Sequence, residues 1–134
     1  MGSLKVGITL SSNSVLSSPV NVAASSSVTA DSGVLVRAKV LKTSVHSDAL
    51  VVYKADDKLV SGYLYVKNLE TEKENYVYIY NDTDSDALVA KIAGSEFCFI
   101  PVAVNKTYKV YATKVDSLVD YAVFGLDSSA VTLS

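Results

Sequence analysis

The sequence predicts an all-β protein: an antiparallel β-sandwich, jelly-roll-like, with a Ser-rich extended N-terminal arm. Composition is the first reason, because valine, threonine, serine and nine tyrosines suit a pleated, half-buried surface. Periodicity is the second, since strand-like segments recur about every ten residues with turn signals between them. No apolar stripe of helical period persists along the chain. The length of 134 residues fits a single unit with a core of its own.

The predicted arm covers residues 1–33, and the predicted sandwich covers residues 34–134. Lys5 and Asp31 are the only charges of the arm, which is otherwise rich in serine. Alternating apolar residues predict two short strands with polar links, docked on the body or on a neighbouring molecule. These residues are Leu4, Val6, Ile8 and Leu10, followed after Pro19 by Val20 and Val22.

The sandwich strands are predicted from alternation bounded by turn residues. The charged segment LETEKE is expected to be a loop between two aromatic strands. These two strands are predicted to pair as a hairpin. The predicted strands are 34–41, 49–54, 62–68, 75–81, 88–94, 96–102, 107–113 and 118–125.

Five tyrosines are the candidate interface of this predicted hairpin. Tyr63 and Tyr65 share one face of the first strand, and Tyr76, Tyr78 and Tyr80 share one face of the second. If the faces match, all five line one side, opposite an aliphatic row. Such a face is ordinary sheet packing or surface, a subunit interface, or a platform for a small ligand such as a carbohydrate. The absence of tryptophan weakens the carbohydrate interpretation.

Asp82, Asp84 and Asp86 have the spacing of the first ligands of an EF-hand calcium loop. Ala87 stands where that loop needs glycine, and Ala93 stands where it needs a bidentate acid. We therefore favour a polar turn, in which Asn and Asp bond their own backbone, over a weak surface calcium site.

Catalysis and most ligand classes are not expected. His46 is the only histidine and Cys98 the only cysteine, and no nucleophile elbow, phosphate loop or dinucleotide motif is present. We predict no enzyme activity and no cofactor. A net charge of −2 without a basic run argues against nucleic acid, and no apolar run is long enough to span a membrane. No signal peptide is recognised, so synthesis in a cytoplasm without export is expected.

The order of elements resembles the small all-β virion proteins of tailed bacteriophages. The matching segments are the N-terminal SLKVGITLSSNSVLSSPVNVAASSSVTAD, the pair YLYVKNL and NYVYIY, and the later IAGSEFCFIPV, KVYAT and VDYAVFG. Such relatives often carry a Pro-Gly-Glu turn before the aromatic strand, where this chain has Gly94-Ser95-Glu96.

The resemblance implies a structural role on the virion, which is assembled in the host cytoplasm, and it brings no catalytic residues. The expected function is capsid decoration or cement at the head surface, with a neck, tail or fibre component as the alternative. Expected partners are the chain itself, as a homo-oligomer with a trimer as one option, and other virion proteins such as the major capsid protein.

Three rival hypotheses remain beside this one. They are a carbohydrate- or host-surface-binding module that uses the tyrosines, an enzyme that uses Cys98 and His46, and a secreted structural protein of cellular origin. For the arm, addition as a strand to the sheet edge of a neighbour is a further hypothesis, since unpaired edge groups accept such strands.

Overall fold

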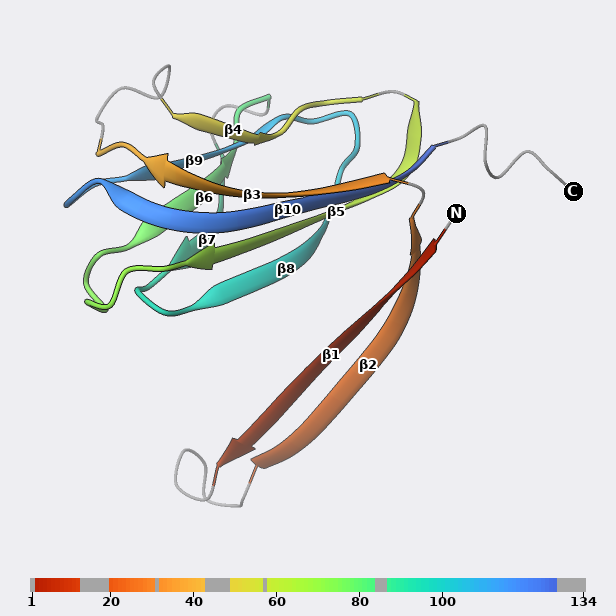
Figure 1. The fold of residues 1–134 in the computed structure, drawn as a ribbon, viewed down its shortest axis with the longest axis horizontal. Helices are drawn as coiled ribbons and strands as arrows, with labels where there is room; N and C mark the ends of the chain where they lie inside the picture. The colour runs from red at the N-terminus through yellow and green to blue at the C-terminus, as the bar shows by residue number, and fades with distance from the viewer. Residues whose placement is uncertain are drawn as a thin grey trace, which may run out of the picture.

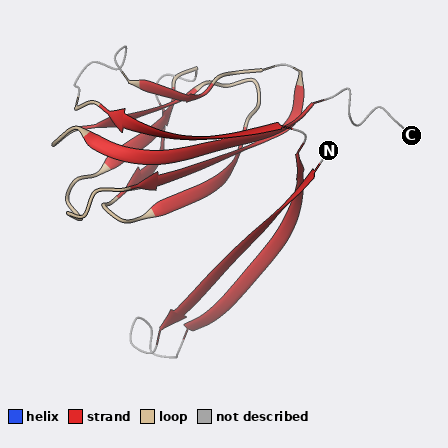
Figure 2. Ribbon diagram, viewed as in Figure 1, coloured by secondary structure: helices blue, strands red, loops and turns tan. Residues whose placement is uncertain are grey.

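The computed structural model describes residues 2–12, 20–30, 32–42, 49–56, 58–83 and 87–127. Every regular element among them is a strand (Figure 2). The ten strands are β1 (Gly2–Ser12), β2 (Val20–Ala30), β3 (Ser32–Val40), β4 (Leu50–Tyr53), β5 (Leu59–Asn68), β6 (Val77–Asn81), β7 (Ala87–Ile92), β8 (Phe97–Val102), β9 (Tyr108–Ala112) and β10 (Ser117–Asp127).

Two four-stranded antiparallel sheets form the sandwich (Figure 1). The first sheet has the order β3-β10-β5-β8, and the second has the order β4-β9-β6-β7. Between β3 and β10 the chain changes sheet at every connection except that from β6 to β7. The predicted antiparallel sandwich is confirmed, and this strand order fits the jelly-roll arrangement of two Greek keys.

The predicted hairpin between β5 and β6 is wrong. β5 pairs with β10 and β8 in the first sheet, whereas β6 pairs with β7 and β9 in the second. The charged loop therefore crosses from one sheet to the other. The reason is that the aliphatic rows of both strands, with Leu64 and Val66 on one and Val77 and Ile79 on the other, enter the same core from its two sides.

Asn68, at the end of β5, holds this crossing in place. Its side-chain amide donates to the carbonyl oxygens of Asn75 (2.7 Å) and Ile92 (3.1 Å). Its Oδ1 atom accepts from the backbone N–H of Glu70 at 3.0 Å. Because Asn68 is fully buried, one side chain satisfies three backbone groups and ties the loop to the end of β7.

The turn from β7 to β8 lies close against the crossing loop. A Cβ atom on Gly94 would collide with the carbonyl oxygen of Glu72, so glycine is required there. Ser95 has φ of 72°, in the left-handed region that residues with a side chain rarely adopt.

The arm is a hairpin, not a pair of separate short strands. β1 and β2 pair antiparallel with each other from Gly2 opposite Ala30 to Ser12 opposite Val20. They form a two-stranded sheet of their own, which diverges from the sandwich toward its tip (Figure 1). The sandwich begins directly after it, with β3 at Ser32.

Candidate interaction surfaces

The outer side of the first sheet carries the largest cluster of aromatic side chains in the described structure. We call it the aromatic face, defined by Tyr63, Tyr65, Phe97, Phe99 and Phe124. Alternation along β5, β8 and β10 directs these residues away from the core, opposite the rows that include Leu64, Ile100 and Val123. The rings of Tyr63 and Phe99 are stacked with centroids 5.7 Å apart, and those of Tyr65 and Phe97 lie 6.2 Å apart.

All three phenylalanines of the chain lie on this face, and none is in the core cluster. Phe97 has 59% of its surface exposed, and Leu35, which neighbours the face on β3, has 71% exposed. Phenylalanine has no polar side-chain atom, so an exposed ring forms no conventional hydrogen bond with water. A sheet whose outer side were only a solvated surface would normally carry polar residues there.

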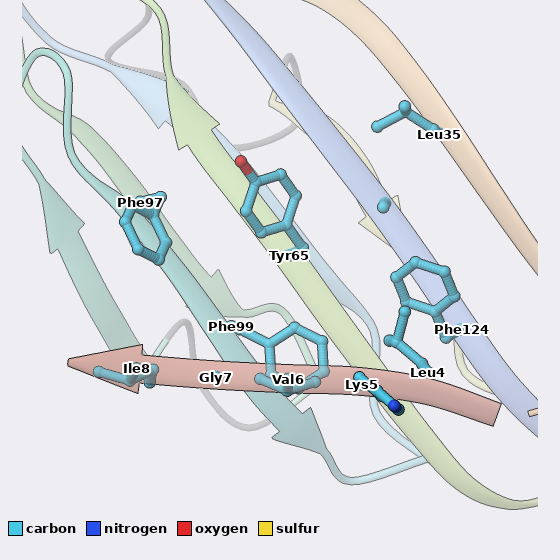
Figure 3. Close-up of a pocket in the computed structure, with 11 residues that line it drawn as sticks. Leu4, Lys5, Val6, Gly7, Ile8, Leu35, Tyr65, Phe97, Phe99 and Phe124 are labelled. Atoms are coloured by element: carbon cyan, nitrogen blue, oxygen red, sulfur yellow. The ribbon is translucent and has the colours of Figure 1, made fainter. Parts of the chain in front are cut away.

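An apolar cleft of about 390 Å³ opens between β1 and the aromatic face. Figure 3 shows β1 running across the sheet above the ring of Phe99. The lining residues are Leu4, Lys5, Val6, Gly7 and Ile8 of the arm and Leu35, Tyr65, Phe97, Phe99, Ala122 and Phe124 of the first sheet.

The apolar row of β1 is covered only near its base. Leu4 and Val6 are half-buried, whereas Ile8 has 44% of its surface exposed and Leu10 has 55%. Exposure rises along the strand because the hairpin diverges from the sandwich (Figure 1). The arm and the aromatic face thus present adjoining apolar surfaces that a single chain does not close.

One ion pair lies beside this surface. Arg37 on β3 donates to both carboxylate oxygens of Asp120 on β10, at 2.8 and 3.2 Å. The hydrogen bond from Arg37 lowers the pKa of Asp120, and its charge acts in the same direction. The two charges satisfy each other on the exposed sheet, so they do not require a charged partner.

A second aromatic cluster lies on the outer side of the second sheet, and we call it the tyrosine patch, defined by Tyr76, Tyr78, Tyr111 and Lys91. Tyr78 stacks on Tyr111 with centroids 5.1 Å apart, and the Lys91 ammonium lies 4.1 Å from the ring centroid of Tyr76. Partial burial raises the pKa of the Tyr111 phenol. Tyr80 stands edge-on to Tyr111 but is buried, so it adds little to the accessible patch.

The five tyrosines expected on one face are therefore divided between two. Tyr63 and Tyr65 lie on the outside of the first sheet, whereas Tyr78 and Tyr80 belong to the second sheet and Tyr76 directly precedes its strand β6. Their common face depended on the hairpin that the structure does not contain. Their role as interface residues stays a prediction for each group separately.

The acidic turn after β6 is described only in part. Asp82 forms an ion pair with Lys109 at 3.3 Å, and its backbone N–H donates to the carbonyl of Thr107. Asn81 Oδ1 accepts from the N–H of Thr83, which is the local bonding expected of a polar turn. Asp84 and Asp86 lie outside the described residues. Within the described part of the chain, no three His, Cys, Asp or Glu side chains are grouped so that they could hold a metal ion.

The catalytic pair considered from the sequence is not tested, because His46 lies outside the described residues. Cys98 lies on the core side of β8, directly opposite Val66. Burial raises the pKa of the Cys98 thiol, which disfavours the reactive thiolate. None of the described residues forms a helix long and apolar enough to cross a membrane.

The structure thus defines an all-β sandwich with a projecting hairpin arm and two aromatic outer surfaces. No family model matches the sequence, and no curated protein matches it. Among solved structures, a chain of Bacillus endospore appendages, described as a novel family of disulfide-linked pili, is similar with a TM-score of 0.47 and 14% sequence identity. The similarity covers 72% of this chain and 87% of that chain. At these values it carries no argument about function.

The three phenylalanines of the aromatic face were not among the interface residues predicted from the sequence. A signal was present, because alternation in EFCFIPV places Phe97 and Phe99 on the face opposite Cys98 and Ile100. Which of these two faces meets the core is decided by the register of β8 against β5, and a single strand does not contain that information.

Proposed function

We propose that this chain is a non-enzymatic structural protein that assembles with copies of itself and with other subunits of a larger particle. The observation that carries the proposal is a pair of partly uncovered apolar surfaces. These are the aromatic face, where Phe97 is exposed, and the outer end of the arm's apolar row, where Ile8 and Leu10 are exposed. Monomeric proteins rarely leave contiguous apolar surface of more than a few hundred Å² open to water.

The particle we favour is a tailed-phage virion, with this protein as a decoration or cement protein on the head surface. Support comes from the resemblance of the Ser-rich N-terminal stretch and of the aromatic strands to such proteins, although Gly94-Ser95-Glu96 replaces their Pro-Gly-Glu turn. A neck, tail or fibre component would use the same surfaces and is the alternative within this class. The subunit would then join the virion during assembly in the host cytoplasm.

Two measurements test this proposal. Multi-angle light scattering of the purified chain is expected to give the mass of an oligomer. Imaging of purified particles with this protein labelled is expected to place the label on the head. Particles that lack the protein would contradict the virion role, and a monomer at every concentration would contradict self-assembly.

The tyrosine patch supports a second candidate, a carbohydrate- or host-surface-binding module. Stacked phenols with exposed faces are suited to the apolar face of a sugar ring. In that case a glycan array gives hits that the Tyr78→Ala variant loses, whereas the exposed Thr113→Ala variant keeps them. An array without hits removes this candidate.

A further inference from the structure

The cleft between the arm and the aromatic face is incomplete in one chain. On one side lie the rings of Phe97, Phe99 and Phe124, and on the other lies the backbone of β1 with Leu4, Val6 and Ile8. The arm leaves the face before its own apolar row ends, since Ile8 and Leu10 are exposed. Both halves of the contact therefore remain partly open to solvent.

The two halves match each other chemically. The arm offers aliphatic side chains, and Lys5, the one charged residue in its described part, lies beside Leu4 and Val6 at the cleft. The face offers rings; of the charges beside it, Arg37 and Asp120 are paired with each other, and Lys67 lies at its end, opposite Phe97. An aliphatic strand against aromatic rings is a contact this chain already makes at Leu4 and Val6, so a second arm of the same sequence fits the same surface.

The dimensions match as well. β1 and β10 both have 11 residues, so the arm is as long as the strand at the middle of the first sheet. At about 3.4 Å per residue, and with two strands about 4.8 Å apart, one arm covers roughly 360 Å² of a flat face. Two reciprocal arms would form an interface of roughly 1,400 Å², counting both partners, which is the ordinary size of a specific interface. The part at Leu4 and Val6 replaces contacts that each chain already makes with its own arm.

We propose that the hairpin arm of a second copy lies across the aromatic face of the first sheet, and that this chain's arm lies across the face of that copy. β2 ends at Ala30 and β3 begins at Ser32, so few backbone dihedrals separate the arm from the sandwich. Because β1 and β2 pair only with each other, exchange of the arm moves one complete element between identical chains and keeps every strand pair of both sandwich sheets. This contact packs one face on another and leaves the strand edges free.

The inference rests on the proposed function, because exchange of arms requires self-assembly. It is tested by cross-linking between two distinguishable full-length chains, both carrying Cys98→Ala so that no native thiol remains. One chain carries Ile8→Cys and a tag, and the other carries Phe97→Cys and a different tag. Both substituted residues are exposed, so circular dichroism should show the native fold. The chains are co-expressed and treated with a short bismaleimide.

The expected result is a covalent link between the two chains, identified by mass spectrometry. Thr9→Cys, on the opposite side of the arm, replaces Ile8→Cys in the matched control and is expected to link at least tenfold less. A chain carrying both Ile8→Cys and Phe97→Cys shows whether the link forms within one molecule. Links found only within one molecule, or in neither arrangement, would overturn the exchange.

Light scattering on the same preparations separates the two proposals. An oligomeric mass together with links only inside single chains would reject the exchange and leave the assembly role standing. A monomeric mass at every concentration would reject both.

Discussion

Asn68→Ala is expected to destabilise the sandwich more than the loss of its few side-chain atoms would suggest. The substitution removes two hydrogen bonds to the carbonyls of Asn75 and Ile92 and one from the N–H of Glu70. The carbonyls of Asn75 and Ile92 then lose a bond at a buried position, and the N–H of Glu70 loses one at a partly buried position. Each unsatisfied buried group costs about 1–3 kcal/mol, and some of these groups will recover a bond by rearrangement or to a water molecule.

We therefore expect the free energy of unfolding to fall by about 3 kcal/mol, a large share of the ~5–15 kcal/mol typical of a domain. For a chain of this length that corresponds to a fall in Tm of roughly 10 °C. Urea denaturation followed by circular dichroism measures the change, and the slope of the transition should stay constant.

Two further variants separate hydrogen bonding from volume. Asn68→Asp has nearly the same size, but it places a carboxylate beside two carbonyl oxygens, so it should destabilise at least as much as Asn68→Ala at neutral pH. Asn105→Ala, at an exposed position, should change stability by less than about 0.5 kcal/mol. A loss below about 1 kcal/mol for Asn68→Ala would refute the argument that this side chain holds the crossing between the sheets.

Three other predictions concern the turn before β8 and Cys98, which lies in β8. Gly94→Ala should cost about 2 kcal/mol or more because its Cβ meets the carbonyl of Glu72, whereas Gly7→Ala, which meets nothing within 4 Å, should be close to neutral in the same urea denaturation. Ser95→Val should cost about 1–2 kcal/mol at its positive φ, and Ser95→Gly should cost nothing; equal losses for both would show that φ is not the cause. Cys98 should react with iodoacetamide at neutral pH at least tenfold more slowly in the native protein than in urea, because burial raises its pKa and limits access; equal rates would contradict its place on the core side of β8.

The strands of the sandwich were predictable because their signal is local. In β5, Leu64 and Val66 alternate with Tyr63 and Tyr65. This period of two is visible in the strand's own sequence, whichever strands pair with it. The turn residues between the strands are equally local. The all-β sandwich followed from these patterns, and the predicted ranges overlap the observed strands from β3 to β10.

Pairing was not predictable in the same way. In the sequence, two strands joined by a charged loop look the same whether they form a hairpin or lie in different sheets. Which arrangement forms depends on the strands that follow them along the chain. β10 is the last strand, yet it lies between β3 and β5. The aromatic face illustrates the consequence, because Phe97 and Phe124 are brought to one surface only by the pairing of β5 with both β8 and β10.

The arm was predicted to be extended, and its alternation was read correctly from Leu4 to Leu10. Its closure into a hairpin depends on the pairing of β1 with β2, which the serine-rich sequence of β2 does not reveal. For the same reason, the surface that the arm covers could not be inferred from its own residues.

Sedimentation analysis of the full chain beside its Ile8→Asp variant tests the central claim, assembly through the arm and the aromatic face, most directly. The full chain is expected to sediment as an oligomer. Ile8→Asp, which places a charge at an exposed position of the arm's apolar row, should shift the chain to a folded monomer, while Thr9→Asp on the opposite side should not. An Ile8→Asp variant that assembles as tightly as the unmodified chain, or an unmodified chain that is monomeric at all concentrations, would contradict the account.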